Sequence, residues 1–74
     1  MTAPVMTAPV IWPQSDGRPV SCREKLRVLE ENYQELAETM QDMFEDAVLM
    51  GVDDAAARRI LADLVAALKS PRRA

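Results

Sequence analysis

The sequence predicts an all-α protein, an antiparallel helical hairpin with a long helix over residues 22–50 and a shorter helix over residues 54–69. Three observations support this fold class. Apolar residues recur at alternating spacings of four and three along the first stretch, and a second helical stripe follows. A glycine and two aspartates separate the two stretches, and prolines flank the pair. Because the connection is only about three residues long, the two helices are expected to pack antiparallel.

The segment that precedes the long helix differs sharply in composition. Residues 1–20 hold four of the five prolines, so we expect a flexible proline-rich N-terminal arm. The pentapeptide Met-Thr-Ala-Pro-Val occurs there twice in tandem, which we interpret as a duplicated start with Met6 as the natural first residue. Trp12 is the candidate arm anchor, because a large ring buries much area at little entropic cost. The alternative, a tryptophan exposed to solvent, stays open.

The long helix has recognisable signals at both ends. Ser21 and Glu24 form the Ser-x-x-Glu pattern of a capping box at its start. Gly51 stands where a left-handed C-terminal cap is needed, and Val52 is the apolar residue expected to fold back on the last turn. Between these ends the apolar positions fit four heptads: Cys22, Leu26, Leu29, Tyr33, Leu36, Met40, Met43, Ala47 and Met50.

The shorter helix has its own signals. Asp53 is predicted to be the N-cap, Lys69 is expected in the last turn, and Pro71 prevents continuation. Its apolar stripe consists of Ala57, Ile60, Leu61, Leu64, Val65 and Leu68. Residues 21–69 therefore form the predicted helical hairpin, and residues 70–74 a short basic tail.

The unequal lengths of the helices predict self-association. The shorter helix, roughly 24 Å long, covers only the C-terminal half of the longer one, so the remaining apolar stripe needs a partner. We expect a homodimer that forms a four-helix bundle. Its predicted self-association interface is Cys22, Leu26, Leu29, Tyr33 and Leu36.

Charge predicts the orientation of the two copies. Residues 1–29 carry +2, residues 30–54 carry −9 and residues 55–74 carry +4. A parallel pairing would stack acidic segments on each other, whereas an antiparallel pairing sets basic residues of one chain against the acidic segment of the other. The predicted dimer is therefore antiparallel.

An acidic face lies opposite the apolar stripe of the long helix. Its candidate residues are Glu31, Glu35, Glu38, Asp42 and Glu45. One interpretation is the solvated back of a surface helix, where glutamate is favoured in any case. The other is a functional surface for a basic partner, for divalent cations, or as a mimic of nucleic-acid phosphate.

No catalytic, cofactor-binding or metal site is predicted, and we expect a protein that is not an enzyme. The chain has no histidine, the commonest general base and transition-metal ligand, and its one cysteine excludes an internal disulfide. Two interpretations of Cys22 stay open: a small core residue, or a reactive thiol whose pKa the helix N-terminus lowers.

The same composition predicts the cellular setting. No apolar run in the sequence exceeds five residues, which is too short for a membrane span, so we expect no membrane insertion. The lack of a secretory signal pattern and the single cysteine predict a cytoplasmic protein. The net charge of −3 argues against nucleic-acid binding.

These observations predict a small non-enzymatic helical protein–protein interaction module, an adaptor, regulator or accessory protein that self-associates. Two alternatives stay open. The first is an obligate small subunit of a larger enzyme or membrane-associated complex, in which the uncovered half of the long helix and the Trp12 arm contact the host. The second is an acidic nucleic-acid mimic that inhibits a DNA-binding protein.

Overall fold

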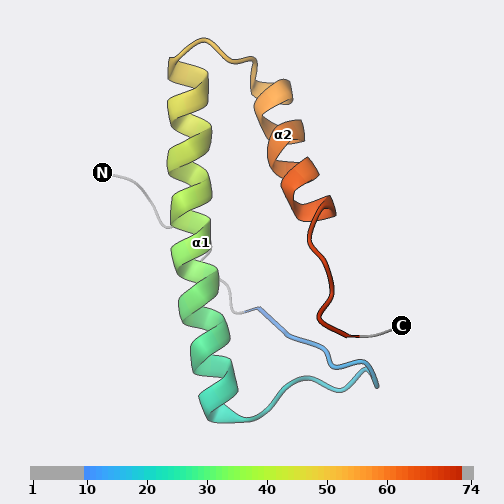
Figure 1. Cartoon of the computed structure of the whole chain (residues 1–74). Coiled ribbons are helices and arrows are strands. Elements are labelled where there is room, and N and C mark those ends of the chain that lie inside the picture. The colour runs from blue at the N-terminus through green and yellow to red at the C-terminus, as the bar shows by residue number, and fades with distance from the viewer. Residues whose placement is uncertain (1–9, 73–74) are drawn as a thin grey trace. The chain divides into compact units, whose positions relative to one another are not determined.

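The computed structural model describes residues 10–72 and contains two helices, α1 (Arg23–Leu49) and α2 (Asp54–Ala66) (Figure 1). Within these residues the only β-structure is one isolated bridge. The prediction of an all-helical chain with two helices is confirmed. The chain divides into two compact units, unit 1 (Met1–Gln41) and unit 2 (Asp42–Ala74), and each is described by itself. The repeated pentapeptide and the start at Met6 lie outside the described residues.

In unit 1, the segment before α1 folds back on itself in a small hairpin. Pro13 and Pro19 face each other in an antiparallel bridge. Two backbone hydrogen bonds of 2.8 Å flank this bridge, from Gln14 N–H to the Arg18 carbonyl and from Val20 N–H to the Trp12 carbonyl. The prolines therefore occupy the pair that makes no ladder hydrogen bonds, where their missing N–H group costs nothing.

Gly17 closes the turn of this hairpin. Its φ is +90°, and its N–H donates to the Gln14 carbonyl at 2.9 Å. The Asp16 carboxylate accepts a hydrogen bond from the Arg18 N–H at 2.9 Å. A turn that ends in a left-handed glycine is typical of three-residue hairpin loops. The sequence prediction treated this region only as a break in helix continuity and missed the Asp-Gly turn signal.

The start of α1 differs from the predicted capping box. Cys22, not Ser21, takes the N-cap position, because its carbonyl accepts the first helical hydrogen bond from Leu26 N–H at 2.9 Å. The Glu24 carboxylate pairs with the Arg27 guanidinium at 2.9 Å, one turn further along. The helix therefore begins one residue later than the pattern predicts.

The end of α1 is a Schellman motif. Gly51 has φ +104°, and its N–H donates to the Val48 carbonyl at 3.0 Å. The N–H of Val52 donates to the Ala47 carbonyl at 2.9 Å. These are the two hydrogen bonds that define the motif, so the predicted roles of Gly51 and Val52 are confirmed.

Gly51→Ala is expected to lower the free energy of unfolding by about 1 kcal/mol, because an L side chain disfavours the left-handed conformation. No heavy atom lies within 4 Å of the site of an added Cβ, so the cost is purely conformational. Urea denaturation followed by circular dichroism measures it. Gly17→Ala, also left-handed and open but in the arm, is the comparison and should leave the helical transition in place. A Gly51→Ala variant as stable as the wild type would contradict the motif.

Asp53 caps the start of α2, as predicted. Its Oδ2 accepts a hydrogen bond from Ala56 N–H at 3.0 Å, and its backbone is extended. The other end differs from the prediction, because α2 stops at Ala66 and its last turn holds no basic residue. Lys69 therefore lies beyond the helix. Beyond Ala66, Leu68 N–H donates to the Val65 carbonyl at 3.1 Å. This hydrogen bond spans three residues, as in a 3₁₀ turn, and it ends the helix.

Burial is shallow throughout the described residues. Between residues 10 and 72 a single residue, Ala57, is buried, at 4% exposure. The predicted heptad positions Leu36 and Met43 are 57% and 43% exposed. A heptad repeat drifts by about 20° per heptad on a helix that does not supercoil, so the row that holds Leu36 and Met43 leaves the covered face, whereas the other heptad row stays half-buried. The half-buried residues of α1 are Leu26, Leu29, Tyr33, Ala37, Met40, Gln41, Phe44, Ala47 and Val48.

Candidate interaction surfaces

The arm lies on part of the surface that the sequence assigns to self-association. The rings of Trp12 and Tyr33 meet edge to face, with centroids 5.9 Å apart and planes at 88°. This T-shaped geometry is favourable for aromatic pairs. Three of the five predicted interface residues are half-buried, namely Leu26, Leu29 and Tyr33. The other two, Cys22 and Leu36, are exposed.

Trp12 is half-buried against α1, in the position of an anchor and not of an exposed tail residue. Val10 and Val20, on either side of it, are half-buried as well. The indole Nε1 atom of Trp12 is buried and has no hydrogen-bond partner. An unpaired buried N–H costs about 1–3 kcal/mol. The arm is therefore held by ring contact and by its own hairpin hydrogen bonds, not by a polar anchor.

Tyr33→Ala is expected to release the arm, with a loss of about 1 kcal/mol of stability and a red shift of Trp12 emission. Acrylamide quenching should rise, because the indole ring moves into water. Leu36→Ala is the control, since Leu36 is exposed and one turn away from Tyr33 on α1. Identical quenching in the Tyr33→Ala variant and the wild type would contradict the ring contact.

Cys22 combines exposure with an unusual electrostatic position. The backbone amide of Lys25, followed by that of Glu24, donates a hydrogen bond to the sulfur and lowers the pKa of the thiol below its ordinary value. The positive charge of Lys25 acts in the same direction. The thiol is free and exposed. Of the two sequence interpretations, the geometry fits a thiol at a helix N-terminus and not a core residue.

The alkylation of Cys22 is expected to have a lower pH midpoint in the folded chain than in the urea-unfolded chain. Because the folded pKa is depressed, the thiolate contributes stability above the unfolded pKa, and this contribution is lost as the pH falls through the folded pKa. Iodoacetamide rates measured across pH in both states give the two midpoints. Coincident midpoints would rule out the amide contacts at the sulfur.

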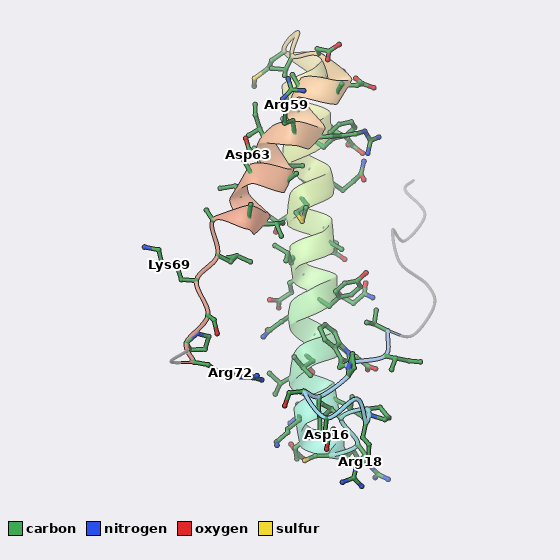
Figure 2. All side chains as sticks on the ribbon, turned by 90° about the vertical axis from the view of Figure 1, so that its right-hand side faces the viewer. Asp16, Arg18, Arg59, Asp63, Lys69 and Arg72 are labelled. Atoms are coloured by element: carbon green, nitrogen blue, oxygen red, sulfur yellow. The ribbon has the colours of Figure 1, made fainter. Side chains whose placement is uncertain are left out.

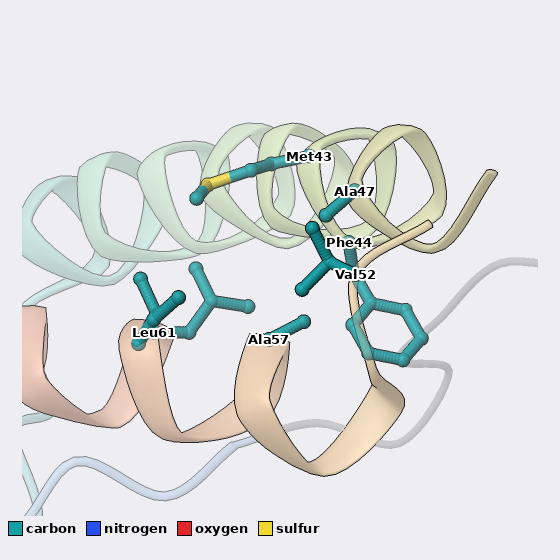
Figure 3. Close-up of a pocket in the computed structure, with 7 residues that line it drawn as sticks. Met43, Phe44, Ala47, Val52, Ala57 and Leu61 are labelled. Atoms are coloured by element: carbon teal, nitrogen blue, oxygen red, sulfur yellow. The ribbon is translucent and has the colours of Figure 1, made fainter. Parts of the chain in front are cut away.

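In unit 2, α2 packs against the last turns of α1. The guanidinium carbon of Arg58 lies 4.7 Å from the centroid of the Phe44 ring, a cation–π contact. A pocket of about 220 Å³ is lined by the apolar residues Met43, Phe44, Ala47, Val52, Ala57, Ile60 and Leu61 (Figure 3). With no polar side chain in its lining, this pocket is a loosely filled hydrophobic core and offers no group for catalysis.

The apolar stripe of α2 becomes more exposed towards its C-terminal end. Ala57 is 4% exposed, whereas Leu64, on the same side of the helix, is 58% exposed, and Leu68, just beyond the end of the helix, is 76% exposed. The large apolar residues from Leu64 onward therefore keep more than half of their surface free. The exposed residues, here called the α2 face, are Ile60, Leu64, Val65 and Leu68.

The predicted acidic face carries its charge along exposed positions. Its residues Glu31, Glu35, Glu38, Asp42 and Glu45 are all exposed. One of them, Glu31, lies 3.6 Å from the Arg27 guanidinium. Across residues 10–72, no three carboxylate, thiol or imidazole groups gather in a way that would hold a metal ion. The negative charge of the acidic face is therefore spread along α1 and is not gathered at one point.

The charge of the opposite sign gathers on α2 and the segment after it. Arg58, Arg59, Lys69 and Arg72 lie there, and Asp63 is the single acidic residue between positions 55 and 72 (Figure 2). The α2 face is therefore bordered by positive charge.

No protein-family model, curated protein or solved structure matches the chain. Neither described helix combines the length and the apolar character that crossing a bilayer requires. The function is therefore inferred from the surfaces themselves.

Proposed function

We propose that the chain is a small non-enzymatic protein–protein interaction module that self-associates as an antiparallel homodimer, forming a four-helix bundle. One observation carries this proposal. Within residues 10–72 a single residue, Ala57, is buried, while eleven large hydrophobic residues are exposed. Apolar surface of this extent on a small chain is typical of an association site.

The α2 face is the strongest candidate for the centre of the interface. Its four residues are 50–76% exposed, whereas Leu26, Leu29 and Tyr33 on α1 are already half-buried within unit 1. Leu36, at 57% exposure, is the predicted α1 residue with apolar surface still free for a partner. The proposed interface therefore combines the α2 face with exposed apolar residues of α1.

Energies explain why both helices are needed. Each side chain of the α2 face is half-exposed or more, so its full burial stabilises by about 1–2 kcal/mol. Two copies together contribute on the order of 10 kcal/mol, against roughly 4–15 kcal/mol of lost translational and rotational freedom. The α2 face alone supports only a weak dimer. A stable one requires apolar surface from α1, which favours a bundle of four helices over a pair of α2 helices.

The melting temperature of the full chain tests the proposal, because folding that is coupled to dimerisation depends on concentration. Circular dichroism from micromolar to millimolar chain should show a melting temperature that rises with concentration. A cooperative transition at a constant temperature would contradict self-association. A chain with no cooperative transition at any concentration would also contradict it, and would favour an obligate subunit of a larger complex.

A further inference from the structure

We propose that the basic end of α2 docks on the acidic end of α1 in a second copy, so that two such contacts, related by a two-fold axis, hold the dimer. The basic end is defined as Leu64 and Val65 of α2 together with Leu68, Lys69 and Arg72 of the segment that follows it. The acidic end is defined as Asp42, Met43, Asp46 and Met50. This inference rests on the proposed self-association and specifies which surfaces meet.

The basic end joins apolar surface to positive charge. Leu64 and Leu68 are 58% and 76% exposed. Lys69 follows Leu68 directly, Arg72 comes three residues later, and both are exposed on the segment after α2 (Figure 2). The surface therefore fits a partner that is apolar in the middle and negative at its edge.

The acidic end of α1 has these complementary properties. Met43, which also lines the pocket against α2, is 43% exposed, and Met50, directly after the last residue of α1, is 82% exposed. The two lie in one row because seven residues make nearly two turns. Asp42 and Asp46 border this row and are exposed. No lysine or arginine occurs between residues 30 and 54, so α1 itself places no positive charge on this surface, although α2 brings the Arg58 cation over the ring of the adjacent Phe44.

Within one chain the two surfaces are held apart. Met43 and Leu61 line the same pocket, and each lies roughly 10 Å along its helix from the link between α1 and α2. The acidic end of α1 lies between this pocket and the link that joins the two helices. The basic end of α2 begins at Leu64, roughly 15 Å from the start of its helix, and continues away from the link. The partner of each surface must therefore come from another copy.

An antiparallel arrangement of two copies satisfies both surfaces at once. Because the acidic end lies near the link and the basic end far from it, reversing one copy brings each basic end onto an acidic end. Apolar contact drives the association, and the opposite charges select the orientation. A parallel pairing of α1 with α1 would instead set acidic residues against acidic residues.

Two charge-reversed chains test the inference. The first carries Asp42→Lys and Asp46→Lys, and the second carries Lys69→Glu and Arg72→Glu. Each variant alone has like charges at the proposed contact, so its dimer should be about tenfold weaker than that of the wild type at low ionic strength. An equimolar mixture should restore a heterodimer, because each reversed end then meets an end of opposite charge. Sedimentation equilibrium and native mass spectrometry measure the two outcomes.

A matched control separates local charge from net charge. Glu30→Lys with Glu31→Lys makes the same charge change in unit 1, at residues that belong to neither end, and should dimerise like the wild type. Circular dichroism of each chain verifies that the helices form. A wild-type dimer whose charge-reversed variants dimerise unchanged, or are not restored by mixing, overturns this inference and leaves the proposed function standing. A wild-type chain that is monomeric overturns both.

Discussion

Ala57→Asp is expected to unfold unit 2, with a loss of roughly 3 kcal/mol or more. Ala57 is the single buried residue among those described, and the pocket around it is lined by apolar side chains alone. A carboxylate there would lose its hydration without gaining a hydrogen-bond donor from the lining residues. Urea denaturation followed by circular dichroism measures the loss, which should appear as reduced helix content in α2 together with an earlier transition.

Ala62→Asp is the matched control, because Ala62 is exposed on the same helix and the chemical change is the same. Its expected cost is the difference in helix propensity, well under 1 kcal/mol. Equal losses in the two variants would show that α2 does not pack on α1 through Ala57, and the account of unit 2 would fail.

Leu64→Glu combined with Leu68→Glu is expected to convert the proposed dimer into a monomer, raising the dissociation constant by about 10²- to 10³-fold. The two leucines are 58% and 76% exposed in the single chain, so their replacement leaves the interior of unit 2 intact. In the dimer, both copies would lose apolar burial and would place carboxylates in the contact. Sedimentation velocity measures the change.

A variant on another side of α2 controls for this double change. Ala62→Glu adds a carboxylate at an exposed position off the α2 face, so it should leave the dissociation constant close to the wild-type value. If the double leucine variant sedimented like Ala62→Glu, the α2 face would not be the centre of the interface.

Local signals were sufficient to predict the link between the helices. Gly51 and Asp53 act on backbone groups within a few residues of themselves, so their roles could be predicted without knowledge of the fold. The Asp16-Gly17 turn is not among the sequence predictions, because the prolines near it are interpreted only as helix breakers. The same local logic favoured Ser21 as the N-cap, since hydroxyl caps are common, although Cys22 takes that position.

Burial was harder to predict, because it depends on what packs against each helix. The heptad pattern of α1 pointed to Leu36 and Met43, yet Ala37 and Phe44 are the half-buried residues at those levels. A heptad row stays on one face only where two long helices supercoil, and between residues 10 and 72 the second helix, α2, is less than half as long as α1. The contact of Trp12 with α1 was equally open, because the pattern of the arm did not distinguish an anchored ring from a solvated one.

The mass of the chain in solution shows directly whether the chain self-associates. Sedimentation equilibrium over a wide concentration range should give a species of twice the 8.2 kDa chain mass, in equilibrium with the monomer at low concentration. A single 8.2 kDa species at every concentration, with circular dichroism showing both helices formed, would contradict the account.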